Sequence, residues 1–179
     1  MDWTFLRSAY NAQAEDYDAQ FRPLQWPKFE ALLGADGARI ADAARVLDAG
    51  CGTGLLGAFL RSAGRTPEQL FGVDVSEGML RRARARGVTV VQADMAQLPF
   101  PDDRFDAVLS FTVLRIIPSD EGRVLREMAR VIRPGGRLVL SLLAERDDDQ
   151  LVIALGAAGF AVEARLDAGQ DVGYLAHRR

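Results

Sequence analysis

Hydrophobic residues recur along the chain in five short runs that are apolar on both faces of an extended segment. Sequence compatible with a helix follows each run. Such runs are typical of strands in a parallel sheet that helices cover on both sides. The pattern therefore predicts an alternating β-α series. The predicted strands are residues 45–50, 70–75, 88–93, 105–111 and 137–143.

Two of the intervening helices are marked by their ends. The segment 119–136 has apolar residues at helical spacing, with Asp120 suited to the helix N-terminus and Pro134 ending the pattern. The next helix is expected to begin near Asp147, one of three consecutive acids, and to end at Gly159.

The end of the chain has a different pattern. Residues 160–166 and 172–177 are predicted as two strands joined by a short glycine-containing loop, which favours an antiparallel hairpin. A β-α series with an antiparallel terminal pair predicts a doubly wound, Rossmann-like α/β sheet that is mostly parallel.

Residues 1–44 precede the first predicted strand and are mostly helical in pattern, until Pro23 and Pro27 break it. We expect a single domain with an N-terminal helical cap over 1–44 and a Rossmann-like core over 45–179. In an open sheet, ligands bind beyond the carboxyl ends of the strands. The cap therefore either covers that crevice as a lid or packs on the body of the domain.

The segment "VLDAGCGTGLLG" at 46–57 holds two overlapping glycine signatures. Gly52, Gly54 and Gly57 spell the G-x-G-x-x-G of dinucleotide sites, whereas Gly50, Gly52 and Gly54 spell a tighter G-x-G-x-G. Both let the backbone turn sharply and a ligand approach closely. Because every nucleotide-like ligand of this fold needs such a turn, the glycines alone do not identify the ligand.

Three acids at successive strand ends are more specific. Asp48 ends the first strand, where it would repel a pyrophosphate and attract an ammonium or sulfonium group. Asp74 ends the second strand, at the place where an acid takes ribose hydroxyls. Asp94 follows the third strand, within reach of an adenine amino group. S-adenosylmethionine carries both cations and no phosphate, so this pattern favours it as the cofactor.

The segments "VLDAGCGTG", "GVDVSEGML", "QADMAQLPFPDDRFDAVLS" and "LREMARVIRPGGRLVLS" resemble, in order and spacing, the motifs of class I S-adenosylmethionine-dependent methyltransferases of the ubiquinone/menaquinone-biosynthesis-like branch. The resemblance covers about residues 44–143. It implies a seven-stranded sheet whose last strand is antiparallel, a helix that closes over the cofactor, and a small-molecule acceptor. The cofactor-binding residues expected on this basis are Asp48, Gly50, Gly52, Asp74, Val75, Met79, Asp94, Met95, Ser110 and Tyr17.

The acceptor site is less defined. After the fourth strand many relatives carry histidines, but this chain has Arg115 near that place, so no general base is evident. Arg115 either orients an anionic substrate or pairs with a nearby acid, and Tyr10 either lines the acceptor site or packs. Methyl transfer is an in-line displacement that runs on positioning and desolvation, so a missing base is compatible with an enzyme.

Two other functions are compatible with parts of the pattern. A protein that binds S-adenosylmethionine or S-adenosylhomocysteine without transferring a methyl group would keep the same cofactor residues. A nucleotide-dependent oxidoreductase would explain the glycines and Asp74, but neither Asp48 nor Asp94.

Composition excludes several other classes. The formal net charge of -3 gives no field that attracts nucleic acid or an anionic membrane, and the run "RRARAR" at 81–86 is expected to be a solvated helix face. Cys51 and His177 are the only cysteine and histidine, which excludes an internal disulfide and makes a metal site very improbable. Without a signal peptide or a long apolar run, we expect a soluble cytoplasmic protein, monomeric or weakly dimeric.

Overall fold

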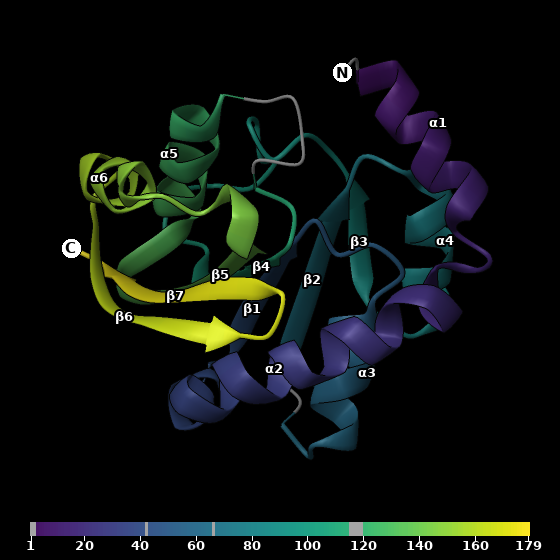
Figure 1. Ribbon diagram of the computed structural model, residues 1–179, viewed down its shortest axis with the longest axis horizontal. Helices are drawn as coiled ribbons and strands as arrows, with labels where there is room; N and C mark the ends of the chain where they lie inside the picture. The colour runs from purple at the N-terminus through teal and green to yellow at the C-terminus, as the bar shows by residue number, and fades with distance from the viewer. Residues whose placement is uncertain (1–2, 42, 66, 115–119) are drawn as a thin grey trace.

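The computed structural model describes residues 3–41, 43–65, 67–114 and 120–179, which form a single mixed sheet with helices on both faces (Figure 1). The strands are β1 (Arg45–Ala49), β2 (Gln69–Asp74), β3 (Thr89–Gln92), β4 (Phe105–Phe111), β5 (Ile132–Leu143), β6 (Phe160–Ala168) and β7 (Asp171–Arg178). The helices are α1 (Trp3–Gln13), α2 (Tyr17–Ala41), α3 (Leu55–Ser62), α4 (Glu77–Ala85), α5 (Glu121–Val131) and α6 (Asp149–Ala157), with a 3-10 turn η1 (Ala144–Arg146).

The seven strands are ordered β3-β2-β1-β4-β5-β7-β6. Neighbours pair in parallel except that β7 runs antiparallel to both β5 and β6. The prediction of a doubly wound sheet with an antiparallel last strand is therefore confirmed. The strand order reverses between β1 and β4, and the carboxyl ends at such a switch point are where ligands bind in this architecture.

The alternation of side chains along β1 decides which face carries the candidate acid. Val46 packs in the core cluster formed with α2 and α3, whereas Leu47 packs in the cluster formed with α5 and α6. Because successive side chains of a strand point to opposite faces, Asp48 shares the face of Val46. Figure 1 shows α2 and α3 covering one face and α5 and α6 the other, so Asp48 lies on the face that α2 covers.

The N-terminal segment differs from its prediction. The chain turns after α1, and α2 then continues through Pro23 and Pro27 as a helix of 25 residues, so the expected break at the prolines is wrong. Both prolines are exposed, while Phe29 and Leu32 anchor the following turns in the core. Helix α1 is only partly buried, since Phe5 is 65% exposed.

Element ends elsewhere follow the sequence more closely. Asp120 caps α5 and Asp148 caps α6, as the acidic residues indicated. The exception is β5, which begins at Ile132, five residues before the predicted start and directly after α5. Ile132 pairs with Phe105 ahead of a shift in register, so the strand ladder and not Pro134 ends the helix.

Candidate functional site

Three positions in the turn that follows β1 have backbone angles that favour glycine. Gly50, Gly52 and Gly54 have φ angles of 80°, 50° and 80°. The N–H of Gly50 donates to the carbonyl of Val73 at 2.9 Å, which holds the turn against β2. A Cβ on Gly50 would lie 2.4 Å from the side chain of Val113. At the carboxyl end of β1, the glycines therefore carry no side chain that would cover the backbone. The hydrogen bond to β2 fixes the position of this backbone.

Asp74 links the ends of the first two strands. Its Oδ2 accepts the N–H of Gly52 at 3.0 Å and its Oδ1 accepts the N–H of Ser76 at 2.9 Å. Each carboxylate oxygen can accept a further hydrogen bond. Burial raises the pKa of Asp74, and the backbone hydrogen bonds only partly offset this effect.

Asp48 is 4% exposed and lines a small pocket of about 40 Å³. Burial first, and the negative charge of Asp74 second, raise the pKa of Asp48 to about 8. The residues of this pocket, called here the carboxylate pocket, are Tyr17, Gln25, Phe29, Asp48, Gly50, Cys51, Gly52, Thr53, Leu55, Leu56 and Phe111. Burial disfavours the charged form of both carboxyl groups, and Asp74 further disfavours the charge of Asp48, so a cation is stabilised here.

Cys51 shares the carboxylate pocket but has no chemistry of its own there. Burial, with Asp48 and Asp74, raises the pKa of its thiol well above the usual value, so the sulfur stays protonated and unreactive. Its Sγ would lie 2.7 Å from a Cβ placed on Gly72 of β2. This close packing supports the interpretation of Cys51 as a small residue that fits the turn.

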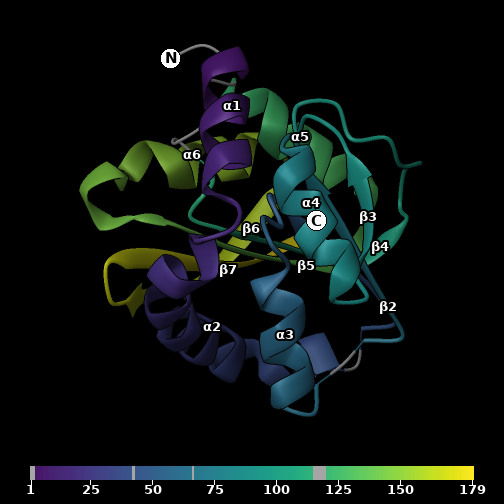
Figure 2. The same ribbon diagram turned by 90° about the vertical axis from the view of Figure 1, so that its right-hand side faces the viewer.

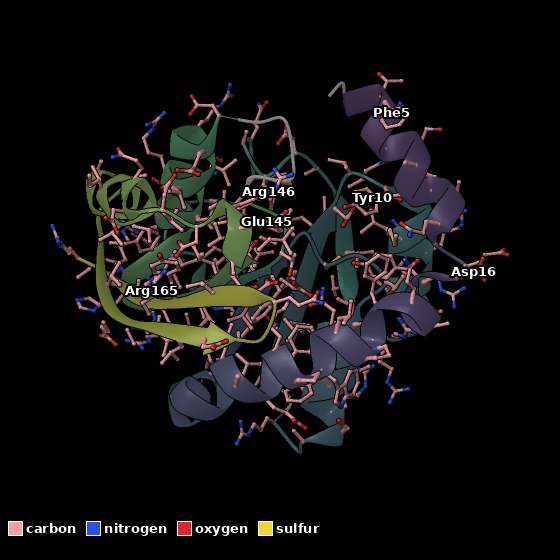
Figure 3. All side chains as sticks on the ribbon, viewed as in Figure 1. Phe5, Tyr10, Asp16, Glu145, Arg146 and Arg165 are labelled. Carbon is pink, nitrogen blue, oxygen red and sulfur yellow. The ribbon has the colours of Figure 1, made fainter. Side chains whose placement is uncertain are left out.

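Two tyrosines cover the carboxylates. Burial raises the pKa of the Tyr17 phenol, and the nearby Tyr10 and Asp74 raise it further. Burial and Asp74 also raise the pKa of Tyr10, which Figure 3 shows on the side of α1 that faces the body of the molecule. Tyr17 stacks on Phe21 with ring centroids 4.5 Å apart. The structure therefore brings both tyrosines close to the carboxylates at the ends of β1 and β2.

Val75 and Asp94 line a second pocket of about 360 Å³, called here the Val75 pocket. Its remaining lining residues are Thr4, Arg7, Gln92 and Ala93. Asp94 Oδ1 accepts the N–H of Ala96 at 2.8 Å, which fixes the loop after β3. The side chain of Met95, which follows Asp94 in the chain, is 4% exposed and belongs to the core. Only the backbone of Met95 is therefore available to the Val75 pocket.

Two further candidate residues, Met79 and Ser110, lie apart from these pockets. Met79 is buried in the first turn of α4, where its N–H donates to the capping Oγ of Ser76 at 3.2 Å. Ser110 is buried in β4, and its hydroxyl donates to the carbonyl of Ala49 at 2.9 Å. Neither is among the lining residues of the two pockets in the described part of the chain. Arg115 lies outside the described residues.

Asn11 is a site residue that the sequence did not reveal. Its Oδ1 accepts the hydroxyl of Ser76 at 2.7 Å and the N–H of Gly78 at 2.8 Å. These bonds hold α1 against the start of α4, and Figure 2 shows the two helices side by side. The only sequence signal is Gly78, where a Cβ would lie 3.1 Å from the Asn11 backbone.

Asp18 provides a second attachment of the N-terminal helices. Its Oδ1 accepts the hydroxyl of Thr53 at 2.5 Å, and its Oδ2 forms an ion pair with Arg86. Burial raises the pKa of Asp18, but the hydrogen bonds from Arg86 and Thr53 outweigh it and hold the pKa below its usual value. Arg82 also approaches Asp18, at 4.0 Å. The arginine run is therefore only partly a solvated face, because two of its members bind α2.

Membrane-spanning helices and metal centres are both missing from the described residues. None of the helices there is long and apolar enough to cross a bilayer. The same part of the chain has no cluster of three or more His, Cys, Asp or Glu side chains placed to hold a metal ion. His177 Nδ1 lies 2.7 Å from Glu163 Oε1 on the β6–β7 hairpin, away from both pockets.

Comparisons with known proteins agree with this geometry. A family model described as a methyltransferase domain matches residues 46–136. A demethylmenaquinone methyltransferase of Symbiobacterium thermophilum is 34% identical over 75% of this chain and 57% of its own length. A malonyl-(acyl-carrier protein) O-methyltransferase of Pseudescherichia vulneris is 34% identical over 92% of this chain and 62% of its own. The chain thus spans about three fifths of the length of these curated relatives.

Among solved structures, an S-adenosylmethionine-dependent methyltransferase from Aquifex aeolicus superposes with a TM-score of 0.73 at 19% identity, covering 94% of this chain and 98% of that one. At this identity the likeness concerns the fold alone. It covers more of the chain than the segment 46–136 that the family model matches.

Proposed function

The chain belongs to the class I S-adenosylmethionine-dependent methyltransferases, and from this premise we propose that it transfers a methyl group from S-adenosylmethionine to a small-molecule acceptor. The observation that carries the proposal is the pair of carboxyl groups at the ends of adjacent strands, the buried Asp48 and the partly buried Asp74. Their raised pKa values mean that a bound cation would stabilise their charged forms. The ammonium and sulfonium groups of S-adenosylmethionine supply that charge, so these residues fit the cofactor.

The arrangement of the two pockets supports a role for each group of residues. The carboxylate pocket would hold the methionine end, with Asp48 as counter-charge and the glycine turn as close backbone. Asp74, between the pockets, would accept the ribose hydroxyls with its remaining lone pairs. The Val75 pocket would hold the adenine beside Asp94 and the backbone of Met95. Tyr17 would cover the methionine end.

The bound cofactor supplies a methyl group on a positively charged sulfur. In transfer, a lone pair of the acceptor forms a bond to the methyl carbon, the carbon–sulfur pair goes to sulfur, and an O–H or N–H acceptor releases its proton. The residues of this chain need to hold the two reactants in line and exclude water. Tyr17 and Phe21, which are half-buried and stacked on each other beside the pocket, suit the second task.

Calorimetric titration tests the cofactor part of this proposal. S-adenosylmethionine and S-adenosylhomocysteine are expected to bind at micromolar concentrations, whereas NAD⁺ is expected to show no heat of binding because its pyrophosphate would meet Asp48. Tight binding of NAD⁺ with no binding of the sulfonium cofactor would refute the assignment.

Incubation with methyl-labelled cofactor and a panel of metabolites tests the transfer itself. A labelled acceptor establishes the enzyme. Binding of the cofactor without a product from any acceptor in a broad panel would favour the alternative, a binding protein that lacks transferase activity. A cytoplasmic location and a monomeric or weakly dimeric state stay predictions, as does the absence of nucleic-acid and membrane partners.

A further inference from the structure

Thr112 directly follows β4 and has a backbone conformation that threonine rarely adopts. Its φ angle is 58°, in the left-handed region. A β-branched side chain is crowded by the backbone in this region, whereas glycine adopts it without strain. Strained residues persist only where the surrounding structure holds them, and they are typical of functional sites. The contacts of Thr112 therefore bear on its function.

A buried network of side chains holds Thr112 in this conformation. Its hydroxyl donates to Asp171 Oδ2 at 2.7 Å and accepts a hydrogen bond from the ammonium group of Lys28. Its N–H donates to the carbonyl of Ser141 at 2.9 Å, and the Ser141 hydroxyl donates to the same Asp171 oxygen at 2.6 Å. The backbone and the side chain of Thr112 are thus both fixed, by residues of α2, β5 and β7.

An ion pair lies at the centre of this network. Lys28 Nζ is 2.9 Å from Asp171 Oδ2, and the two side chains are 5% and 1% exposed. Lys28 is the only lysine among 22 basic residues, and its compact ammonium suits an enclosed position better than a guanidinium fork. Loss of either partner alone would leave a buried charge unpaired. The two residues therefore act as a unit on the Thr112 hydroxyl.

The residues on both sides of Thr112 border the proposed cofactor site. Phe111 lines the carboxylate pocket, as does Gly50 of the glycine turn. The side chain of Val113 occupies the space that a Cβ on Gly50 would take. Thr112 itself is not among the lining residues of this pocket in the described part of the chain. Because the φ angle of Thr112 sets the direction in which the chain leaves β4, it decides whether Val113 reaches the glycine turn.

We propose that Thr112 is a positioning residue for cofactor binding, an inference that rests on the proposed methyltransferase function. Lys28 and Asp171 hold its backbone in the left-handed conformation, and this conformation places Val113 against Gly50. The glycine turn is thereby fixed from the β4 side, whereas the hydrogen bond of Gly50 to Val73 fixes it from the β2 side.

Substitutions at position 112 test the proposal in calorimetric titrations with S-adenosylhomocysteine. Thr112→Ser keeps the hydroxyl and is expected to bind within about twofold of the wild-type affinity. Thr112→Val keeps the β-branch but removes the hydroxyl that holds the strained backbone, so it should bind at least about fivefold more weakly. Thr112→Gly also lacks the hydroxyl, but glycine adopts a positive φ without strain, so its affinity should fall by less than about threefold.

The order of these affinities separates positioning from a merely structural role. Loss of packing or of the hydroxyl alone predicts that the glycine variant binds most weakly, whereas positioning of the backbone predicts that the valine variant does. Thermal unfolding establishes a temperature at which every variant is folded. Thr89→Val, at an exposed threonine of β3, is the matched control and is expected to bind like the wild type. Equal or weaker binding by Thr112→Gly than by Thr112→Val refutes the proposal.

A double-mutant cycle tests whether Thr112 acts through Val113. Val113→Ala removes the methyl groups that lie against Gly50. If both residues act through this contact, adding Thr112→Val to Val113→Ala should weaken binding by less than about a further twofold. Losses of affinity that are additive overturn the assignment.

A rescue experiment tests the ion pair, and it also decides the question if Thr112→Val does not fold. Lys28→Met with Asp171→Leu removes both charges together and is expected to weaken binding of S-adenosylhomocysteine at least about threefold. Adding Thr112→Gly should then improve the affinity at least about twofold, because glycine does not need the network to keep its φ angle. Absence of any improvement contradicts the role of the network.

Titration of the wild-type protein separates the two levels of inference. If S-adenosylhomocysteine does not bind to it, the proposed function fails and the positioning role fails with it. If it binds and the variants at position 112 do not follow the expected order, only the positioning role fails.

Discussion

Replacing Asp48 by asparagine tests the electrostatic basis of cofactor binding most directly. The substitution Asp48→Asn keeps the shape of the side chain and removes its charge. Burial and Asp74 raise the pKa of Asp48 to about 8, so only about one tenth of this carboxyl is ionised at pH 7. A cation placed beside it stabilises the ionised form. Binding of S-adenosylmethionine is therefore expected to release a proton from Asp48.

The size of the effect follows from the pKa. One pH unit below the pKa, ionisation costs about 1.4 kcal/mol, and two units below it costs about 2.7 kcal/mol. The wild-type affinity for S-adenosylmethionine should thus rise about tenfold from pH 6 to pH 7 and level off above pH 8. Tyr17 and Cys51 line the same pocket as Asp48, and Asp74 is its charged neighbour. The Tyr17 phenol and the Cys51 thiol have raised pKa values and stay protonated between pH 6 and pH 8. Asp74 is present in both the wild type and the Asp48→Asn variant.

Calorimetry in two buffers of different ionisation enthalpy counts the protons. At pH 7 the wild-type protein is expected to release about 0.9 proton more than Asp48→Asn on binding, and the affinity of the variant should be weaker and less dependent on pH. Asp102→Asn, which alters a carboxylate that is 72% exposed, is the control. If Asp48→Asn binds S-adenosylmethionine with wild-type affinity and the same proton release, the electrostatic reasoning is wrong even though the family assignment stands.

The substitution Asp48→Asn is expected to weaken cofactor binding but to stabilise the folded protein. Between the ordinary pKa of 3.8 and the folded value of about 8, the folded protein holds a proton that the unfolded chain has lost, so the contribution of Asp48 to stability falls as pH rises. The loss amounts to at most roughly 4 kcal/mol at pH 7. Asp48→Asn should therefore melt at a higher temperature than the wild type, by a margin that grows from pH 5 to pH 7.5. Thermal unfolding of the two proteins without cofactor measures it.

Two further substitutions probe the frame around the site. Asp18→Ala removes the acceptor of Arg86 and is expected to lower the free energy of unfolding by about 1.5–3 kcal/mol and to loosen α2. Urea denaturation and hydrogen exchange measure these two effects. The control Asp16→Ala alters an exposed neighbouring carboxylate, which Figure 3 shows at the surface, and should lower the free energy of unfolding by less than about 0.5 kcal/mol. Equal losses in the two variants would contradict the attachment. Gly50→Ala places a Cβ 2.4 Å from a valine side chain and should destabilise the protein by more than Gly64→Ala, which shares a positive φ but has open space. Thermal unfolding compares the two glycine variants. Equal decreases in melting temperature would mean that the contact between the new Cβ and the valine side chain is relieved without loss of stability.

The central strands β1, β4 and β5 were predictable because they are buried on both faces. The fourth predicted strand, 105–111, coincides with β4, and the glycine turn and its acids lie at the carboxyl ends that the alternation implied. These features are local: an apolar run, a turn and a cap each depend on adjacent residues. Local patterns therefore predicted the sheet and brought Asp48 and Asp74 to the same site.

Contacts between distant segments were beyond such patterns. Asn11 is hydrogen-bonded to Ser76, 65 positions away in the sequence, and Asp18 to Arg86, 68 positions away. No periodicity in the sequence indicates either contact. Proline's low helical propensity gave the wrong ending for α2, since packing of the later turns outweighs it. The single lysine was visible as a departure from an arginine-rich composition, but only the structure places Lys28 beside Asp171.

The course of α2 through two prolines has a mechanical consequence. Pro23 and Pro27 have no N–H, so the carbonyls of Ala19 and Pro23 lose the helical bonds they would otherwise accept. The first half of α2 thus has fewer helical hydrogen bonds, while its later turns are fixed in the core. Bending of this stretch would displace Tyr17 and leave the sheet that holds the carboxylates in place.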